Sequence, residues 1–283
     1  MTYTTLVDCE VLARHLANGW RVFDCRFVLS DAGAGERSYH DGHIPGAEYL
    51  HLDHDLAAPV TAVSGRHPLP DPTVLAATLA SAGVHKTTQV IAYDASSGEF
   101  AARLWWLLRW LGHAQVAVLD GGWRQWCQEG RQVSRESPRM VKPGNFHAQP
   151  DDGFWLSSAA VAERLRRGNL CLLDARAASR FRGEQETIDP VAGHVPGAVN
   201  LPYAGNVLVD GRFQSAEALR ARFVAALNGA DPADTACMCG SGVTACHNLL
   251  AMELAGLRGA KLYAGSWSEW IRDPSRPVAT RDG

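Results

Sequence analysis

Short apolar runs and stretches with a helical period alternate along the whole chain. Apolar runs bounded by turn residues predict strands at residues 22–24, 89–93, 115–119, 170–174, 235–238 and 261–263. Apolar residues at helical spacing predict helices at residues 7–16, 74–82, 100–111, 123–127, 159–167, 216–227, 243–255 and 267–271. Strands that alternate with helices predict an α/β fold, with a parallel sheet covered by helices on both faces. In such sheets, ligands bind beyond the carboxyl ends of the strands.

The two halves of the chain contain three short matching segments in the same order. Val22-Phe-Asp-Cys-Arg26 matches Leu172-Leu-Asp-Ala-Arg176, and Gly42-His-Ile-Pro-Gly-Ala47 matches Gly193-His-Val-Pro-Gly-Ala198. Asp120-Gly-Gly-Trp-Arg-Gln-Trp126 matches Ala264-Gly-Ser-Trp-Ser-Glu-Trp270. The matching segments lie about 150 positions apart, which indicates a duplicated domain rather than a solenoid. The sequence predicts one domain at residues 1–133 and a second at 154–283, joined at 134–153 by a polar linker rich in Pro and Gly.

Composition narrows the class of protein. Hydrophobic residues make up 46% of the 283 positions and charged residues 20%, which is typical of a soluble globular protein. The net charge of −3 and the absence of a basic run predict no nucleic-acid partner. The apolar run at 104–108 is too short for a membrane span, and the N-terminus resembles an amphipathic helix rather than a signal peptide. The seven scattered cysteines indicate reduced thiols, so we expect a cytoplasmic protein without a membrane partner.

One segment of the second half has the pattern of a reactive loop. Residues 235–247, Thr-Ala-Cys-Met-Cys-Gly-Ser-Gly-Val-Thr-Ala-Cys-His, predict a strand, a tight loop and the start of a helix. Gly240 and Gly242 let the backbone fold back over Cys239, because glycine tolerates positive φ. Inward-pointing N–H groups and the helix that begins near Val243 would stabilise an anion at the centre of the loop. The thiolate is the nucleophilic form of cysteine, so Cys239 is the predicted nucleophile.

The loop Cys239-Gly-Ser-Gly-Val-Thr244 resembles the active-site loop of the rhodanese superfamily, in the form typical of 3-mercaptopyruvate sulfurtransferases. The paired His-x-Pro-Gly-Ala segments and the Gly-Ser-Trp-Ser-Glu-Trp segment are similar to the same two-domain family, from about Leu6 to Val278. The resemblance implies two tandem rhodanese-like domains and a ping-pong reaction. A donor leaves its sulfur on Cys239 as a persulfide, and cyanide, a small thiol or reduced thioredoxin then removes it. The resemblance implies no metal and no organic cofactor.

The first half lacks a cysteine at the corresponding place. The strand predicted at 89–93 is followed by Asp94, where the second half has Cys239. A carboxylate cannot form a persulfide. We therefore expect the first domain to be catalytically silent, as the resemblance implies for two-domain members.

The resemblance also suggests catalytic roles for residues other than Cys239. Ser241 is expected to donate a hydrogen bond to a substrate carbonyl or to relay a proton. His43 is a candidate for proton transfer, with Asp31 as its candidate partner. The repeat favours a structural role for His43 instead, because His194 occupies the equivalent place, and both interpretations stay open. The loop residues expected to bind substrate are Gly240, Gly242, Val243 and Thr244, of which the last also suits a helix cap.

Arginines near the second His-x-Pro-Gly segment are candidates for the substrate carboxylate, because a guanidinium binds two oxygens at once. Arg180 matches the substrate-binding arginine of the family, whereas Arg176 ends a strand and suits a structural ion pair. The role of Arg182 stays open. Many mercaptopyruvate enzymes have a second arginine shortly before this segment, and residues 184–193 contain none. The uncharged loop favours 3-mercaptopyruvate and the missing arginine favours thiosulfate, so both donors stay open.

Other interpretations of the loop have weaker support. A zinc site formed by Cys237, Cys239, Cys246 and His247 would have a spacing that matches no standard site. Cys237 and Cys246 are expected to be core residues, with a redox role as the alternative. A phosphatase with the same fold would need an arginine at position 245, which is Ala245 here. A silent rhodanese used as a binding module is the non-enzymatic alternative.

Overall fold

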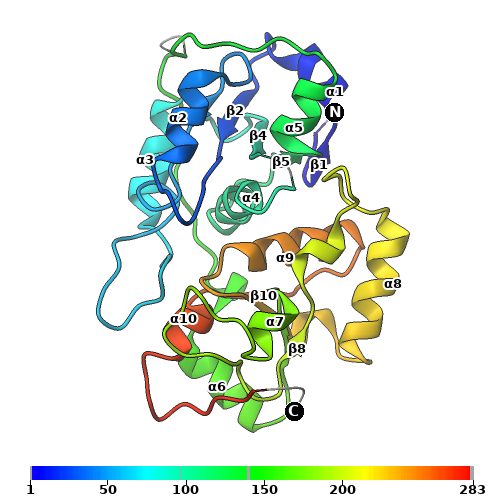
Figure 1. Cartoon of the computed structure of the whole chain (residues 1–283). Helices are drawn as coiled ribbons and strands as arrows, with labels where there is room; N and C mark the ends of the chain where they lie inside the picture. The colour runs from blue at the N-terminus through cyan, green and yellow to red at the C-terminus, as the bar shows by residue number, and fades with distance from the viewer. Residues whose placement is uncertain (1, 96, 139–140, 281–283) are drawn as a thin grey trace. The chain divides into compact units, whose positions relative to one another are not determined.

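The computed structural model describes residues 2–95, 97–138 and 141–280, and the chain forms two compact units (Figure 1). Unit 1 comprises Met1–Ala58, Leu69–Asp151 and Val207–Phe213, and unit 2 comprises Pro59–Pro68, Asp152–Asn206 and Gln214–Gly283. The chain passes between the units at five points, and one of them, between Asp151 and Asp152, lies inside the linker predicted at 134–153. The domain limits themselves stay a prediction.

Unit 1 contains a five-stranded parallel sheet with the order β1-β5-β4-β2-β3. Its strands are β1 (Leu6–Val7), β2 (Arg21–Asp24), β3 (Glu48–Tyr49), β4 (Val90–Tyr93) and β5 (Val116–Leu119). Its helices are α1 (Cys9–His15), α2 (Ala34–Asp41), α3 (Pro72–Ser81), α4 (Ala101–Trp110) and α5 (Gly122–Gln128). The central strands β4 and β5 are buried throughout and uniformly apolar, because helices cover both faces of a parallel sheet.

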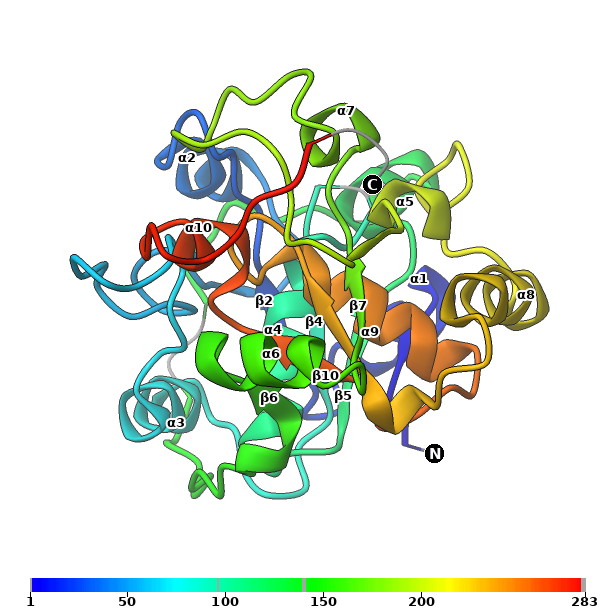
Figure 2. The same ribbon diagram turned by 90° about the horizontal axis from the view of Figure 1, so that it is seen from below.

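Unit 2 repeats this architecture with the strand order β6-β10-β9-β7-β8. Its strands are β6 (Trp155–Leu156), β7 (Cys171–Asp174), β8 (Val199–Asn200), β9 (Thr235–Met238) and β10 (Lys261–Tyr263). Its helices are α6 (Ser158–Arg166), α7 (Ala178–Phe181), α8 (Ala216–Leu227), α9 (Thr244–Leu254) and α10 (Ser266–Trp270), with 3-10 turns η1 (Asp152–Phe154), η2 (Tyr203–Asn206) and η3 (Pro232–Asp234). Helix α8 packs against α9, as the view in Figure 2 shows. Both sheets confirm the predicted α/β fold.

The two faces of the second sheet have different neighbours. Met238 and Tyr263 belong to a core cluster that includes Trp267 and Trp270 of α10. On β9 the side chain of Cys237, between Ala236 and Met238, contacts Met252 of α9 at 3.9 Å. Since successive side chains of a strand point to opposite faces, α10 and α9 cover opposite faces of this sheet.

The beginning of the chain differs from the prediction. The helix predicted at 7–16 starts later, because Val7 belongs to β1 and pairs with β5. Asp8 then caps α1, and its side chain accepts the Val11 N–H at 2.7 Å. The strands β1, β3, β6 and β8 were not predicted, because two residues are too few to show a period, and the helices α2 and α7 were not predicted either.

Each unit includes a short segment from the other half of the chain. The Arg66 N–H of segment 59–68 donates to Ser268 Oγ at 3.0 Å in unit 2. The Phe213 N–H of segment 207–213 donates to Asp120 Oδ1 at 2.8 Å in unit 1. A division of the sequence into two continuous halves does not reveal that segments 59–68 and 207–213 belong to the unit formed by the other half.

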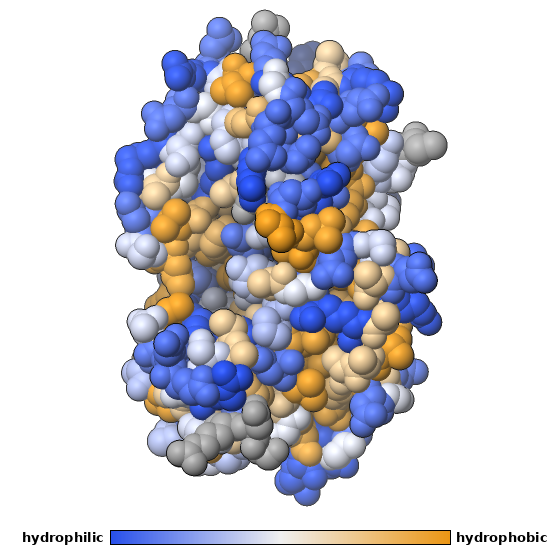
Figure 3. All heavy atoms as spheres, turned by 45° about the vertical axis from the view of Figure 1, so that its right-hand side comes forward, coloured by the Kyte–Doolittle hydropathy of each residue, from blue (hydrophilic) through white to orange (hydrophobic). Residues whose placement is uncertain are grey.

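Within the described ranges, no helix is long and apolar enough to cross a membrane. The face drawn in Figure 3 has hydrophobic residues in separate groups among hydrophilic ones.

A buried ion pair follows the second strand of the repeat in both units. In unit 2, Arg176 donates to Asp174, with Nη2 at 2.8 Å from Oδ2, and also to Gly193 O at 2.9 Å. Its guanidinium lies over the Trp267 ring, 4.8 Å from the centroid. Unit 1 has the same arrangement, with Arg26 bonded to Asp24 and Gly42 and stacked on Trp123. The pair joins the strand end to the His-x-Pro-Gly segment and the helix after the last strand, and it confirms the structural role predicted for Arg176.

We expect Asp174→Asn to lower the free energy of unfolding by up to about 3–5 kcal/mol, because it removes the carboxylate bonded to the buried Arg176 guanidinium and leaves only Glu186, at 3.7 Å, as its charged partner. The Asp174 and Arg176 side chains are 0% and 1% exposed. Urea denaturation of the whole chain measures the loss. Glu163→Gln is the matched control, since its pair with Arg166 is exposed, and it should leave the midpoint nearly unchanged. Equal midpoints for both variants would show that the buried pair contributes little.

Candidate active site

The predicted nucleophile lies in a sharp loop between β9 and α9. Cys239 directly follows β9, is 2% exposed, and α9 begins five residues later at Thr244. The N–H of Gly242 donates to Cys239 Sγ at 3.2 Å. Gly242 has φ +79°, and a Cβ there would clash with the Ala264 carbonyl oxygen. Only glycine therefore allows the turn that aims this N–H at the sulfur.

Helix α10 holds the loop from the side. The Trp267 N–H donates to Cys239 O at 3.0 Å, and the Ser268 N–H donates to Gly240 O at 2.9 Å. Ser266 has φ 53°, which is rare for a serine, and its Oγ accepts the Cys239 N–H at 3.1 Å. The Gly-Ser-Trp-Ser-Glu-Trp segment of the repeat therefore fixes the backbone of Cys239, the predicted nucleophile.

Ser241 has a histidine partner that the sequence did not reveal. His67 Nδ1 lies 2.7 Å from Ser241 Oγ, and the two residues are 4% and 6% exposed. His67 belongs to segment 59–68, which is part of unit 2 although it comes from the first half of the chain. A serine hydroxyl bonded to an imidazole can relay a proton. The pair lies two residues along the loop from Cys239.

His43, the predicted histidine, is bound within unit 1. Its Nδ1 lies 2.9 Å from Tyr39 O, its Nε2 lies 3.1 Å from Glu136 O, and its ring stacks on Tyr39 at 4.1 Å. His194 repeats this in unit 2, where Nδ1 lies 2.8 Å from Phe181 O and the ring stacks on Phe181. Carbonyl oxygens that face both ring nitrogens of His43 favour the structural interpretation. His67 therefore replaces His43 in the site that we propose.

Asp31, the candidate partner of His43, forms an ion pair with Arg37 instead. Its carboxylate pairs with Arg37 at 2.5 Å, and both side chains are more than half exposed. Its contact with Arg37 is a surface ion pair.

Arg180 lies at the loop, and it is the predicted arginine with the most favourable position. A Cβ on Gly240 would lie 3.6 Å from both Arg180 Nη1 and Nη2, so the guanidinium borders the residue next to Cys239. Arg180 Nη2 donates to Glu186 Oε1 at 2.9 Å and to Asp189 Oδ2 at 3.0 Å. Burial opposes the charge of Glu186, yet the hydrogen bonds from Arg180 hold its pKa below the usual value. Arg182, in contrast, pairs with exposed Glu184.

The remaining predicted loop residues surround the start of α9. Val243 is the residue before the helix and is buried at 4%, and Thr244 is the first residue of α9 and half-buried. Gly240 is buried beside two arginines, because a Cβ on it would also lie 2.7 Å from Arg66 Nη2. A larger residue at position 240 would displace the Arg66 guanidinium.

The neighbouring cysteines have core contacts. Cys237 contacts Met252, as described above, and burial raises its pKa far above the usual value. The Cys246 thiol donates to Gly242 O at 3.3 Å, and His247 Nδ1 lies 3.2 Å from Asn206 Nδ2. These contacts place Cys237 and Cys246 in the core, as predicted, and a redox role stays untested.

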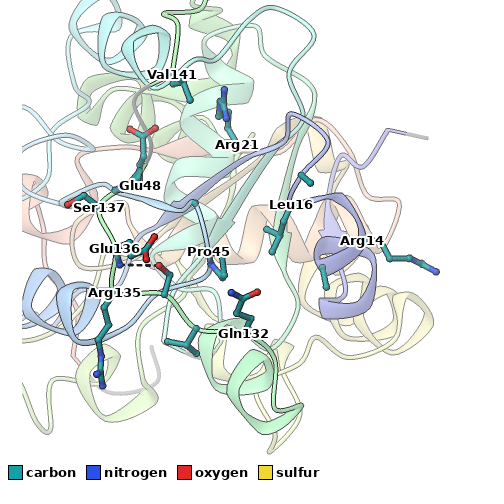
Figure 4. Close-up of a pocket in the computed structure, with 16 residues that line it drawn as sticks. Arg14, Leu16, Arg21, Pro45, Glu48, Gln132, Arg135, Glu136, Ser137 and Val141 are labelled. Carbon is teal, nitrogen blue, oxygen red and sulfur yellow. Dashed lines mark hydrogen bonds between the residues drawn. The ribbon is translucent and has the colours of Figure 1, made fainter.

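A separate hollow lies in unit 1 and is shown in Figure 4. Its volume is about 990 Å³, and Arg21, Glu48, Gln132 and Arg135 are among the residues that line it. Burial raises the pKa of Glu48, which Arg21 partly offsets. None of the residues predicted for the active site lines this hollow.

A match to a protein-family model shows which family the chain belongs to. The model of the rhodanese-like domain matches residues 8–129 and 157–273, which together span most of the chain. The chain belongs to the rhodanese-like family. It is a tandem member with one rhodanese-like domain in each half, which confirms the predicted family and fold class.

Relatives in this family extend over the full length. A Pseudomonas aeruginosa protein named "probable 3-mercaptopyruvate sulfurtransferase" is 48% identical over 285 residues, with 100% of each chain covered. A Mycobacterium tuberculosis protein named "putative thiosulfate sulfurtransferase SseB" is 38% identical and covers 91% of this chain and 89% of its own. The structure of 3-mercaptopyruvate sulfurtransferase from Leishmania major has a TM-score of 0.85 at 29% identity, covering 96% of this chain and 76% of that one.

The first rhodanese-like domain has a carboxylate at the position that corresponds to Cys239. The Trp123 N–H donates to Asp94 O at 2.8 Å, just as Trp267 bonds to Cys239. The Asp94 carboxylate is fully buried and accepts the N–H groups of Gly98, Phe100 and Ala101 at 2.8–3.1 Å. In this domain the N–H groups of the loop therefore bind the protein's own side chain. The catalytic silence of the domain stays a prediction.

Asp94 should make the stability of the chain depend on pH. Burial and the nearby Glu99 raise its pKa to about 7, against the usual 3.8. The folded chain therefore holds a proton that the unfolded chain releases between about pH 4 and 7, so stability falls as pH rises through this window, by at most about 1.4 kcal/mol per pH unit. We expect Glu99→Gln to flatten this fall, because it removes the neighbouring charge.

Urea unfolding of both proteins at several pH values checks this prediction. The unfolding free energies should converge at low pH and separate by pH 8, with the variant the more stable. Glu10→Gln, an exposed change in the same domain, should follow the wild type. Parallel curves for wild type and Glu99→Gln would contradict the role of Glu99.

Proposed function

We propose that the chain is a sulfurtransferase that moves a sulfur atom from 3-mercaptopyruvate to a thiophilic acceptor through a persulfide on Cys239. The observation that carries the proposal is the loop itself, in which Gly242 N–H donates to Cys239 Sγ at 3.2 Å and Ser241 Oγ lies 2.7 Å from His67 Nδ1. A nucleophilic sulfur thus lies close in the chain to a pair of groups that can move a proton.

In the first half-reaction the Cys239 thiolate attacks the sulfur of the donor. An S–S bond forms and the donor C–S bond breaks, and its electron pair passes to the carbon, giving the enolate of pyruvate. A proton delivered by the Ser241–His67 pair completes pyruvate. The thiol proton of the donor stays on the outer sulfur, so the enzyme holds a neutral Cys persulfide.

In the second half-reaction the acceptor attacks the outer sulfur and the Cys239 thiolate leaves. Cyanide yields thiocyanate, and a small thiol or thioredoxin yields its own persulfide. The outer proton is released to water. These acceptors, together with the donor, are the partners that we propose. All seven cysteines are free thiols, which supports a reducing, cytoplasmic setting for this reaction.

We propose that the silent domain spans residues 1–133, the linker 134–153 and the catalytic domain 154–283. His67 then enters the catalytic unit from outside this last range, through segment 59–68.

Thiosulfate is the second candidate donor. The missing arginine in residues 184–193 and the name of the M. tuberculosis relative support it. The uncharged loop Gly-Ser-Gly-Val-Thr and the more similar P. aeruginosa relative favour the keto acid, whose carboxylate has a single charge.

Steady-state kinetics with cyanide as acceptor and each donor in turn tests the assignment. We expect kcat/KM for 3-mercaptopyruvate to exceed that for thiosulfate. A much higher kcat/KM for thiosulfate would make the 3-mercaptopyruvate assignment wrong.

A further inference from the structure

Two arginines from distant parts of the sequence share one carboxylate beside the nucleophile. Asp189 Oδ1 accepts a hydrogen bond from Arg66 Nη1, and Asp189 Oδ2 accepts one from Arg180 Nη2 at 3.0 Å. The Asp189 side chain is 2% exposed, whereas those of Arg66 and Arg180 are 24% and 19% exposed. The carboxylate is thus enclosed while part of each guanidinium is accessible.

Both guanidinium groups border the reactive loop. A Cβ on Gly240 would lie 2.7 Å from Arg66 Nη2 and 3.6 Å from the terminal nitrogens of Arg180. Gly240 directly follows Cys239, so an anionic group of a donor bound at the sulfur would be close to both arginines. Within the part of the chain that the structure describes, the buried Arg66 Nε has no hydrogen-bond acceptor. Arg66 therefore has donor capacity that no described residue uses.

The position of Arg66 is fixed by its own segment. Its N–H donates to Ser268 Oγ at 3.0 Å, at the start of the helix that also holds Cys239 O. A Cβ on the preceding Gly65 would lie 2.7 Å from the Gly265 carbonyl oxygen, so this backbone packs tightly against the Gly265-Ser266 turn. Arg66 and the nucleophile are therefore positioned by the same element.

The charges of the cluster balance. Arg66 and Arg180 carry two positive charges, and Asp189 and Glu186 carry two negative ones. Both carboxylate oxygens of Glu186 lie 3.1 Å from Arg180 Nε and accept its hydrogen bond. Arg66 has Asp189 as its carboxylate partner. An incoming carboxylate therefore has more to gain from Arg66 than from Arg180.

We infer that Arg66 is the second arginine that binds the carboxylate of the donor, in place of the arginine absent from residues 184–193, and that Asp189 positions Arg66 and Arg180 for this role. The inference rests on the proposed function, because it needs a donor with a carboxylate. Arg66 would determine specificity for a 2-keto acid with a terminal carboxylate over the same molecule without that charge.

The test compares 3-mercaptopyruvate with its carboxamide, in which a neutral amide replaces the carboxylate. We expect Arg66→Ala to lower kcat/KM for the acid about 10- to 100-fold, mainly through KM, because a lost hydrogen bond between charged groups has this effect. The kcat/KM for the carboxamide should fall by less than about threefold. Arg66→Lys should recover part of the loss, since lysine keeps the charge but not the planar fork.

Two controls separate binding from folding. Arg66→Gln keeps most of the side-chain stem, and it replaces Arg66→Ala in the kinetic test if the alanine variant does not fold. Arg182→Ala removes a nearby arginine whose partner is exposed Glu184. It should leave kcat/KM unchanged for both the acid and its carboxamide. Thermal unfolding of each variant shows whether the chain stays folded.

The outcomes are distinct. A selective loss with the acid supports the inference. An equal loss with both donors, or no loss with either, overturns it and leaves the proposed function in place. A wild type that prefers thiosulfate overturns the proposed function and the inference with it.

Discussion

Cys239→Ser should abolish sulfur transfer with both 3-mercaptopyruvate and thiosulfate, down to the rate without enzyme. Serine is close in shape, so its oxygen can still accept the Gly242 N–H that now donates to Cys239 Sγ at 3.2 Å. A hydroxyl has too high a pKa to be ionised near neutral pH and cannot hold a sulfane sulfur as a persulfide. The loss is therefore chemical rather than structural.

Mass spectrometry after incubation with each donor measures the intermediate directly. The wild type should gain the mass of one sulfur atom on the peptide that contains Cys239, and Cys239→Ser should gain none. Cys127→Ser is the matched control, because Cys127 is the exposed cysteine of unit 1 and its removal should change neither rate nor mass shift. A persulfide on another cysteine would contradict the assignment. Failure to detect any persulfide with either donor would favour a binding module instead.

The sequence was sufficient to predict the strand, loop and helix around Cys239, the predicted nucleophile, because every feature of this segment is local. The apolar run at 235–238, the two glycines and the following helix lie in one continuous segment, and the structure has them in that order. Asp94 could be recognised for the same reason, since it follows the corresponding strand of the first repeat. The duplicated segments likewise predicted two similar sheets.

The partners of the loop could not be predicted in this way. His67 and Arg66 lie 174 and 123 positions from their partners Ser241 and Asp189, in a segment without strand or helical period. The His-x-Pro-Gly motif was the stronger signal in the sequence, yet His43 packs on Tyr39 as its repeat His194 packs on Phe181. A histidine that recurs at the same place in both copies, one with Asp94 and one with Cys239 in the loop, indicates a structural requirement of the fold.

The contrast between positions that recur in both copies and positions that differ has a general physical basis. Positions that recur in both copies support what the copies share, which is the sheet, the buried ion pair and the helix contact to the loop. If only the second copy is reactive, as we propose, the residues that make it so must differ between the copies. Cys239 differs from Asp94 by this criterion, and Arg66 and His67 are not part of any of the three matching segments.

The second large effect that we expect concerns Ser241 and His67. His67→Asn and Ser241→Ala should each lower kcat with 3-mercaptopyruvate by about 10²- to 10⁴-fold, the usual contribution of positioned acid–base groups. The pyruvate enolate that leaves in the first half-reaction needs a proton, and the 2.7 Å contact between Ser241 Oγ and His67 Nδ1 offers the route. KM should change little, because neither side chain is placed on the carboxylate.

Thiosulfate provides the discriminating comparison for this pair. Its leaving group is sulfite, which departs as a stable anion without a proton. Turnover of thiosulfate should therefore fall far less in both variants than turnover of the keto acid. His40→Asn, at an exposed histidine of unit 1, should leave both donors unaffected. An equal loss with the two donors would mean that the pair supports the loop rather than moving a proton.

The double variant His67→Asn with Ser241→Ala decides whether the two groups act as one relay. In a relay, removing either member already breaks the path of the proton, so the double variant should be no slower than the worse single variant. Independent contributions would instead multiply, and the double variant would lose the product of the two factors. The expected non-additivity would appear in kcat for 3-mercaptopyruvate and be absent for thiosulfate, because only the keto acid requires the proton that this pair delivers.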